Sequence, residues 1–544
     1  MIKVFNKDGN LKLRFAENAS EQIKEWLAKN ETTEKEAMNH MEKIKDPVFG
    51  NAVEFPCSVL LTTEQLKDMN KIFITTTLPY INADRPHAGH FLEFVQADVI
   101  TRYLRINFNV RFNVGVDEHG LKIYEQANNL GLDPQKYCDK QAEQWKKFFD
   151  KFNITYDNFY RTTSQVHKLK IQDVWNYYIS NGDIYKKTYT GLYCKGCESF
   201  KLDKDLVNGK CSDHDIVPEK IEEDNWFFKI IKYKKNLLKW LEHNSDFLLP
   251  KYKLSELKNI IEESEDISVS RLKTSVPWGI EVPNDSEQVI YCWLEALHNY
   301  LFAANYDSKD ADNFWNNNLT IIIAGPDNIR FQGHIFQIFL EALNVKHTTK
   351  LLIHGTVLDK DGHKMSKTLG NVIDPIAQID KFGLDAVRYY AIAGLTTFGD
   401  GCWSEKDLVE LHNSELADNF GNLLARVLHL IDLKKVEVTN VDFEFKEIVC
   451  EKISKVESAY AEFNLYSAVR EITGVFKFGN QYMNSAEPWR SEHYVSTLSN
   501  LHYLLTVTVG CLSPVIPDSC ERALTALKEC KKTIIFPKIK CEKE

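Results

Sequence analysis

The stretch KIFITTTLPYINADRPHAGHFLEFVQADVITRYLRI, residues 71–106, decides the fold of this chain. It opens with a run of β-branched and aromatic residues that stops at a proline, which predicts a buried strand. A polar loop follows, and apolar side chains then recur at helical spacing from Leu92 to Tyr103, which predicts a helix. A strand, a loop and a helix in this order are typical of a parallel α/β sheet.

Three more short apolar runs have the same character. They are RFNVGV at 111–116, LTIIIAG at 319–325 and LLIHGTV at 351–357, and polar or ionisable residues follow each of them. Ligands of parallel sheets bind at the carboxyl ends of the strands. We therefore expect a site built from the polar residues at these ends, which are Tyr80, His87, His90, Asp117, Asp327 and His354.

Changes in pattern divide the chain into segments. The two pairs of strands lie on either side of residues 117–318, an interval too long for one crossover, so we expect an inserted module between them. After Trp403, strand signals become few and apolar residues recur three and four apart from Leu416 to Ile431, which predicts a helical bundle. The predicted segments are an N-terminal extension (1–70, with a capped helix from Thr33), a Rossmann-like catalytic domain (71–182 and 251–370), a connective insertion (183–250), a linker (371–404) and an all-α domain (405–544).

Composition limits the class of protein. The 544 residues are 44% hydrophobic and 26% charged, which is typical of a globular chain and excludes a disordered one. The net charge of −10 excludes a histone-like cationic surface but allows local contact with nucleic acid. No window holds 18 consecutive apolar residues and the N-terminus is polar, so we expect a cytoplasmic protein without a membrane span. Twelve cysteines in a chain of this length do not indicate a disulfide framework.

Four residues in the predicted insertion have the spacing of metal ligands. Cys194 and Cys197 form one pair, and Cys211 and His214 form a second pair 13 residues further on. Two such pairs suit a closed tetrahedral Zn²⁺ site of structural type. The alternative is a degenerate knuckle that no longer binds metal.

Two short motifs carry the chemistry. In PHAGH, at 86–90, a glycine and two histidines lie where a strand gives way to a helix, and free N–H groups at a helix start suit a phosphate. In KMSK, at 364–367, two lysines lie near glycines in a loop that can close on a polyphosphate. Alone, each motif has an ordinary explanation as a structural histidine pair or a solvated loop. Their order on one α/β scaffold favours a nucleotide site.

PHAGH and KMSKT resemble the two signature motifs of class I aminoacyl-tRNA synthetases, and within that class the chain is most similar to methionine–tRNA ligases. The resemblance runs from about residue 71 to at least 490, and it includes GVDEHGLKI (115–123), YCWLEALHNY (291–300) and FGNLLAR (420–426). It implies that ATP and methionine form methionyl-adenylate with Mg²⁺ present, and that the aminoacyl group then passes to the terminal adenosine of tRNA(Met).

The resemblance also implies roles for single residues. His87 and His90 are expected to contact the phosphates during adenylate formation, and Lys364 and Lys367 to clamp the pyrophosphate side. The implied ATP-binding set is His87, Gly89, His90, His354, Gly355, Lys364 and Lys367.

For the amino acid, the resemblance assigns the substrate ammonium to Asp117 and the thioether to an aromatic wall. The implied pocket is Leu78, Tyr80, Asp117, His119, Trp293, Leu297, Tyr300, Asp327, Phe331 and Gln332. For the tRNA, it implies that Asn422, Arg426 and Trp489 read the CAU anticodon by hydrogen bonds and stacking.

The chain departs from the family pattern near the side-chain pocket. Pro326 replaces a lysine, Gln332 replaces a histidine that lines the pocket, and Glu295 stands where aspartate is usual. These changes motivate a second hypothesis, a relative with a retuned pocket that tolerates an analogue, resists an inhibitor or serves another pathway. A third hypothesis is a catalytically silent tRNA-binding module. We expect a monomer in each case.

Overall fold

The computed structural model describes residues 2–5, 11–14, 71–82, 85–194, 199–201, 206–211, 215–309, 312–365, 370–438 and 441–540. Within the predicted N-terminal extension it describes two paired strands, β1 (Ile2–Phe5) and β2 (Leu11–Arg14). The helix predicted from Thr33 lies outside the described residues.

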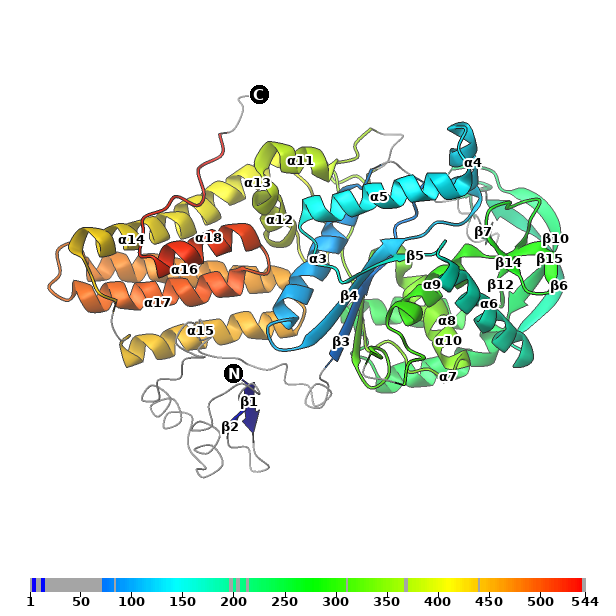
Figure 1. Ribbon diagram of the computed structural model, residues 1–544, viewed down its shortest axis with the longest axis horizontal. Coiled ribbons are helices and arrows are strands. Elements are labelled where there is room, and N and C mark those ends of the chain that lie inside the picture. The colour runs from blue at the N-terminus through cyan, green and yellow to red at the C-terminus, as the bar shows by residue number, and fades with distance from the viewer. Residues whose placement is uncertain are drawn as a thin grey trace.

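A six-stranded parallel sheet lies at the centre of the molecule (Figure 1). Every neighbouring pair in it is parallel, as the strand–helix alternation predicts. The order across the sheet is β11 (Leu248–Leu249), β17 (Lys350–Ile353), β16 (Leu319–Ala324), β3 (Lys71–Thr76), β4 (Asn109–Val116) and β5 (Asn158–Arg161).

Both faces of this sheet are buried, which explains why its strands read as continuous apolar runs. Ile72 and Ile74 of β3 enter a core shared with α3 (Ala88–Leu104), whereas Phe73 enters a second core shared with α9 (Cys292–Ala303). The first core also contains α4 (Leu121–Asn129), α5 (Pro134–Phe152), α11 (Pro375–Phe382) and α12 (Leu384–Ala393), and the second contains α6 (Gln165–Ser180), α7 (Ile230–His243), α8 (Leu254–Glu262) and α10 (Phe336–Ala342).

The predicted insertion contains an antiparallel sheet, and part of it returns to the central sheet. Strand β11 falls inside the predicted range 183–250 but pairs with β17, so the separate module is shorter than predicted. The smaller strands are β6 (Ile184–Cys194), β7 (Ser199–Lys201), β8 (Leu206–Val207), β9 (Lys210–Cys211), β10 (Glu219–Phe228), β12 (Ile267–Ser268), β13 (Ser270–Leu272), β14 (Ile280–Val282), β15 (Asp285–Ile290), β18 (Val357–Leu358) and β19 (Gly401–Cys402).

Beyond Trp403 the described chain is helical, as predicted. The residues from Leu416 to Ile431 that set the spacing of the prediction are buried. Helix α17 (Tyr494–Leu512) is long and apolar enough to cross a membrane, but 67% of its apolar window is buried, which accounts for its composition. The helices are α13 (Glu405–Leu411), η6 (His412–Gly421), α14 (Asn422–Lys434), α15 (Phe443–Ala461), α16 (Leu465–Ala486), α17 (Tyr494–Leu512) and α18 (Pro517–Lys528).

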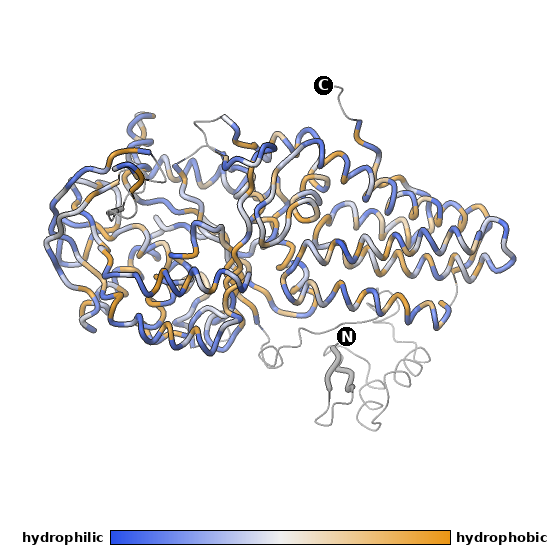
Figure 2. The backbone as a smooth tube through the Cα atoms, turned by 180° about the vertical axis from the view of Figure 1, so that it is seen from behind, coloured by the Kyte–Doolittle hydropathy of each residue, from blue (hydrophilic) through white to orange (hydrophobic). Residues whose placement is uncertain are grey.

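The molecule is elongated, with the helical bundle at one end and the antiparallel strands β6 and β10 at the other (Figure 1). The hydropathy colouring shows apolar stretches gathered on the central strands and along the bundle helices (Figure 2). The carboxyl end of the parallel sheet therefore lies between two differently built parts of the chain.

Candidate active site

The PHAGH segment forms the turn between β3 and α3, and its two histidines cap the helix. The His87 Nδ1 atom accepts hydrogen bonds from the backbone N–H groups of Gly89 (3.1 Å) and His90 (3.4 Å). In return, the His87 N–H donates to His90 Nδ1 at 3.3 Å. Because both Nδ1 atoms accept, a neutral ring in either position carries its proton on Nε2. The turn thus offers two imidazole N–H donors.

The two rings are stacked, with centroids 3.8 Å apart and planes 23° from parallel, and His87 at this distance opposes a charge on His90. The pKa of His90 is held well below its ordinary value by burial, and then by the nearby His87 and His354. A neutral ring matches the hydrogen-bond pattern of the turn. A side chain at Gly89 would come within 2.9 Å of the His87 ring, so this position requires glycine for the stack to form.

A buried carboxylate joins the ends of two strands to α3. Glu93 Oε1 accepts from Thr77 N (2.8 Å) and Thr77 Oγ1 (2.5 Å), just beyond β3. Glu93 Oε2 lies 3.3 Å from His354 Nε2, just beyond β17. Of these residues, His354 was predicted from the sequence, whereas Glu93 and Thr77 were not. A glutamate inside the apolar run FLEFV was the available signal.

The lysine motif lies beside the histidine turn, nearly three hundred positions away in the sequence. The backbone N–H of Ala88 donates to Ile373 O (3.1 Å), and the Arg85 guanidinium pairs with Asp374 (2.8 Å). Lys364 Nζ lies 3.1 Å from Asp327 Oδ2, with both side chains exposed. The Ile373 N–H in turn donates to Met365 Sδ at 3.4 Å, so the described part of the lysine motif, Lys364 and Met365, lies at the same end of the sheet as the histidine turn. Lys367 lies outside the described residues.

The predicted amino-acid pocket is divided between the end of the sheet and helix α9. Tyr80 pairs with Asp117 in a parallel bridge, and the Asp117 N–H donates to Pro79 O at 3.0 Å, so these two candidates adjoin. Leu297 is buried on α9. Leu78 is half-buried beyond the end of β3.

The aromatic wall of this pocket is a stacked pair. The rings of Trp293 and Phe331 lie 3.5 Å apart and 6° from parallel. Phe331 lies on the π-helix η5 (Ile329–Ile335), which follows the 3₁₀ turn η4 (Pro326–Asn328). Asp327, which is predicted to line the amino-acid pocket, is exposed and pairs with Lys364.

Gln332 and Tyr300 meet in the interior beside this wall. Gln332 Nε2 donates to the Tyr300 hydroxyl at 3.2 Å, and both side chains are buried. Gln332 Oε1 is buried without a hydrogen-bond partner among the residues that the structure describes. A buried carbonyl acceptor of this kind is costly unless a ligand or water supplies a donor.

A buried chain of ionisable groups passes behind the pocket. Glu295 Oε1 lies 3.0 Å from His119 Nδ1, and Glu295 Oε2 lies 2.7 Å from His167 Nε2. The other nitrogen of His167 lies 3.2 Å from the Tyr160 hydroxyl. Burial raises the pKa of the Glu295 carboxyl, but His119 and the hydrogen bonds from both histidines outweigh burial and lower it overall. His119 was predicted from the sequence as a site residue and Glu295 as a departure from the family pattern, whereas His167 and Tyr160 were not predicted.

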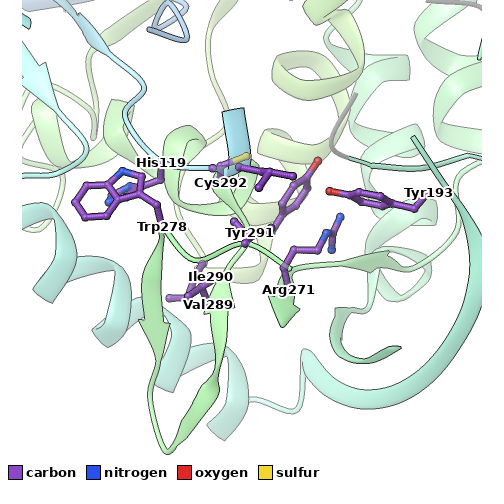
Figure 3. A pocket seen from close by; sticks show the side chains of 11 residues that line it. His119, Tyr193, Arg271, Trp278, Val289, Ile290, Tyr291 and Cys292 are labelled. Atoms are coloured by element: carbon purple, nitrogen blue, oxygen red, sulfur yellow. The ribbon is translucent and has the colours of Figure 1, made fainter. Parts of the chain in front are cut away.

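A small cavity of about 10 Å³, room for about one water, lies next to His119 (Figure 3). The indole of Trp278 and the side chains of Arg271 and Tyr291 border it. The Arg271 guanidinium lies 4.1 Å from the centre of the Tyr291 ring. Arg271 is buried and was missed from the sequence because no local motif marks an isolated arginine in a strand.

The predicted metal ligands are described only in part. Cys194 at the end of β6 and Cys211 in β9 are buried, which suits thiolate ligands of a structural site. Cys197 and His214 lie outside the described residues. Within the described ranges, no three histidine, cysteine or acidic residues are grouped as a metal site would require.

The three predicted anticodon residues share one region of the helical bundle. The Arg426 guanidinium lies 5.7 Å from the centre of the Trp489 ring and donates to Asn484 Oδ1 at 3.1 Å. Asn422 is exposed one helical turn before Arg426, and Trp489 is 37% exposed. An arginine, an aromatic ring and an amide at one surface can hydrogen-bond and stack with unpaired bases.

A parallel sheet with a histidine turn after β3 and a lysine loop after β17 defines a class I aminoacyl-tRNA synthetase. A family model described as tRNA synthetases class I (M) matches residues 72–215 and 201–428. The chain belongs to this family, the methionine–tRNA ligases.

Individual relatives and solved structures are similar to this chain over most of its length, in agreement with the family assignment. The methionine–tRNA ligase of Caldanaerobacter subterraneus is 33% identical over 84% of this chain and 74% of its own length. The Rickettsia felis enzyme is 33% identical over 86% of this chain and 94% of its own length. A Mycobacterium tuberculosis methionyl-tRNA synthetase in complex with methionyl-adenylate superposes with a TM-score of 0.78, at 28% identity, over 84% of this chain and 93% of that structure.

Proposed function

We propose that this chain activates methionine with ATP to form methionyl-adenylate, and then transfers methionine to the terminal adenosine of tRNA(Met). The observation that carries the proposal is that Ile373 and Asp374 lie against the histidine turn through the Ala88–Ile373 and Arg85–Asp374 contacts, while the Ile373 N–H also contacts Met365, the neighbour of Lys364. The structures of relatives bound to methionyl-adenylate support the same reaction.

On the nucleotide side, the chain supplies hydrogen-bond donors where negative charge develops. The Nε2–H groups of His87 and His90 come from stacked rings. The backbone N–H groups at the start of α3, which the sequence led us to expect free for phosphate, instead hold this turn by bonding to the two histidines and to Ile373 O. Fixed donors of this kind stabilise the charge on the α-phosphate as the methionine carboxylate attacks it. Mg²⁺ bound with ATP supplies further charge neutralisation on the phosphates.

Lys364 is suited to move onto the leaving pyrophosphate. Its partner Asp327 is exposed, and exposed ion pairs contribute only about 0–1 kcal/mol, so the pair separates readily. The amine of Lys364 is then available for a phosphate oxygen. Lys367 is proposed to act beside it.

On the amino-acid side, Asp117 is proposed to pair with the substrate ammonium. The Trp293–Phe331 stack and the buried Tyr300 form an apolar and aromatic boundary that suits a thioether. Leu78, Tyr80 and Leu297 complete the proposed wall.

The anticodon is proposed to bind at Asn422, Arg426 and Trp489. The Arg426–Trp489 contact supports this, because it places a donor next to a partly exposed ring. Replacement of Trp489 with Ala is expected to raise the KM for tRNA while leaving adenylate formation unchanged.

A structural Zn²⁺ is proposed at Cys194, Cys197, Cys211 and His214. The burial of the two described cysteines supports it. Metal analysis of the purified chain, and thiolate charge-transfer absorption after Co²⁺ substitution, test this proposal separately from activity. The zinc proposal is contradicted if the purified chain contains almost no metal and also shows no thiolate absorption after Co²⁺ is added.

The chain is also proposed to act as a monomer in the cytoplasm. Light scattering after size exclusion tests the oligomeric state, and cell fractionation tests the location.

The decisive assay is ATP–pyrophosphate exchange with each of the twenty amino acids, followed by charging of tRNA with a CAU anticodon. Methionine is expected to exceed every other amino acid by orders of magnitude. Replacement of His90 with Ala is expected to lower the rate by at least about a hundredfold, as the loss of one transition-state donor does elsewhere. Exchange with no amino acid would exclude the catalytic half and favour the silent tRNA-binding module.

A second candidate is the same reaction with a retuned side-chain pocket. The buried, unpartnered Gln332 Oε1 favours it, because this acceptor suits a side chain that carries a donor. The twenty-amino-acid assay separates the two candidates. A methionine analogue used within tenfold of methionine supports the retuned pocket.

A further inference from the structure

Trp145 of helix α5 contacts His90, although it lies outside both signature motifs. The ring centroids are 5.4 Å apart and the planes are 86° from parallel, an edge-to-face arrangement. Trp145 is 2% exposed, and its indole Nε1 has no hydrogen-bond partner within the described part of the chain. The interactions that the described structure shows for this indole are therefore ring contacts, the one with His90 among them.

The indole is held firmly in place from its other sides. Phe94 of α3 lies 6.2 Å away, and Phe148 and Phe149 of α5 lie 5.8 Å and 5.9 Å away, measured between ring centroids. Asp133 caps the start of α5 by accepting from the backbone N–H groups of Gln135 and Lys136. A capped helix with an aromatic cluster gives Trp145 little freedom to move.

His90 is therefore confined by two rings in different directions. His87 stacks on its face at 3.8 Å, and Trp145 meets it at a right angle. The hydrogen bond from the His87 N–H to His90 Nδ1 is 3.3 Å long, near the upper limit, so it is weak alone. Without the indole, His90 has space to rotate away from His87 and expose Nδ1 to water.

We propose that Trp145 is a positioning residue for adenylate formation, which holds the His90 ring against His87 so that its Nε2–H faces the phosphates. This proposal rests on the proposed function, but its structural half, the control of the His90 ring, stands independently. Among the described residues, the ring contacts of Trp145 are with His90, Phe94, Phe148 and Phe149, and none of these belongs to the predicted amino-acid pocket.

A pH effect follows from the same geometry. The titratable groups that face His90 are His87 from the capping turn and His354 from the end of β17, with Glu93 against His354. Helix α5 presents the neutral indole. Removing the indole admits water, so the pKa of His90 rises toward its ordinary value and the ring gains a proton on Nδ1 at mildly acidic pH. A protonated Nδ1 can no longer accept the hydrogen bond from the His87 N–H, so the capping turn loses this contact.

The test compares Trp145→Phe and Trp145→Leu with the wild-type full-length chain. The rate of adenylate formation is expected to fall severalfold in Trp145→Phe and about tenfold or more in Trp145→Leu, with the KM for methionine within about twofold of wild type. The acidic limb of the rate profile is expected to shift to higher pH in both variants. A structural defect alone changes neither the split between kcat and KM nor the pH profile.

The matched control is Trp175, which is 1% exposed, lies in the second core and packs edge-to-face on Trp226 at 6.1 Å. Trp175→Phe is expected to lower thermal stability as much as Trp145→Phe does, but to leave the kcat and its pH profile unchanged. If the two Phe variants behave alike in kcat and in pH profile, the proposal is overturned.

Side-chain NMR of ¹⁵N-labelled histidine gives a readout that needs no activity. In the wild type, His90 is expected to remain the neutral Nε2–H form from pH 8 to about pH 6, whereas in Trp145→Phe it begins to titrate in that range. An unchanged His90 titration in a folded Trp145→Phe chain overturns the proposal. If the wild type exchanges no amino acid, the proposed function fails, and the NMR result still decides the role of Trp145.

Discussion

Arg388 and Asp98 form an ion pair in the interior, with Arg388 Nη2 2.6 Å from Asp98 Oδ2 and both side chains 0% exposed. Asp98 lies on α3, the helix that begins with the histidine turn, and Arg388 lies on α12. The same guanidinium donates to Phe152 O at the end of α5 (3.0 Å) and to Val515 O between α17 and α18 (2.9 Å). One side chain thus ties the catalytic sheet to the helical bundle.

Replacing Arg388 with Met is expected to destabilise the chain by about 3–5 kcal/mol, because it leaves a buried carboxylate without its main partner and several carbonyls without donors. Urea unfolding followed by circular dichroism measures the change. The double variant Arg388→Met with Asp98→Leu is expected to recover part of the loss, since it removes the uncompensated charge.

The control is the exposed pair of Lys381 and Glu405, 2.9 Å apart with both side chains nearly half exposed. Lys381→Ala is expected to change the stability by less than about 1 kcal/mol. Equal losses from Lys381→Ala and Arg388→Met would contradict the role given to the buried pair.

Acid is expected to weaken the same contact. Burial raises the pKa of the Asp98 carboxyl, but Arg388, Arg102 and the hydrogen bonds from Thr155 and Arg102 lower it overall. A carboxyl whose folded pKa is depressed contributes stability above its unfolded pKa of about 3.9, and this contribution is lost as pH falls through the folded value. Thermal unfolding between pH 7 and pH 3 is expected to show a smaller acid loss in Asp98→Asn than in wild type. An equal acid loss in both chains would show that Asp98 does not contribute.

The amino-acid pocket can be tested at the pair of Gln332 and Tyr300. Gln332→Leu removes the 3.2 Å hydrogen bond and leaves the Tyr300 hydroxyl buried without this partner, which costs about 1–3 kcal/mol. If the pair lines the pocket, the KM for methionine is expected to rise about tenfold while the KM for ATP stays constant. Tyr300→Phe in the Gln332→Leu background is expected to add little further loss, because the two effects share one hydrogen bond.

Much of the fold could be predicted from the sequence. The apolar runs at 71–76, 111–116, 319–324 and 351–353 are strands of one parallel sheet, because burial on both faces leaves a continuous apolar signal. Strand β11 was included in the predicted insertion although it pairs with β17 of the central sheet. A strand of two residues has no periodicity to detect, and its partner β17 lies about a hundred residues further along the chain.

The site could be predicted only where a motif marks it. His87, His90 and Lys364 belong to local patterns, and the structure brings their segments together. Glu93, His167 and Trp145 belong to no pattern, since their roles arise from partners brought near by the sheet and helices. The π-helix η5 around Phe331 and Gln332 is equally hidden, because its backbone bonds depend on packing and not on a residue type.

The Glu295 bridge predicts that the length of this side chain matters. Its two oxygens reach His119 and His167 on different elements, at 3.0 Å and 2.7 Å. Glu295→Asp shortens the reach by one methylene, so one of the two contacts is lost, at a cost of about 1.5–3 kcal/mol for a hydrogen bond to a charged group. Both stability and the KM for methionine are expected to suffer, because His119 and Trp293 lie on the segments that the bridge joins. A stable Glu295→Asp chain with unchanged KM would show that the bridge is dispensable.

The backbones of Gly355 and Gly399 approach each other closely next to His354. A Cβ atom at Gly355 would lie 1.8 Å from the carbonyl oxygen of Gly399, so Gly355→Ala forces apart the two segments that lead into the paired strands β18 and β19. Overpacking of this kind costs about 1–3 kcal/mol or more, and here it also displaces the neighbouring His354 from Glu93. Adenylate formation is therefore expected to fall further than stability alone would explain.

Gly474 provides the matched control for Gly355. It lies inside α16, and a Cβ atom there meets nothing within 4 Å. Gly474→Ala is expected to stabilise the helix by about 0.5–1 kcal/mol and to leave adenylate formation unchanged, because alanine loses less backbone entropy than glycine in a helix. Opposite signs for the two substitutions in unfolding, with an activity loss confined to Gly355→Ala, are the expected result. Wild-type activity in a folded Gly355→Ala chain would contradict the close approach of the two glycine backbones at this site.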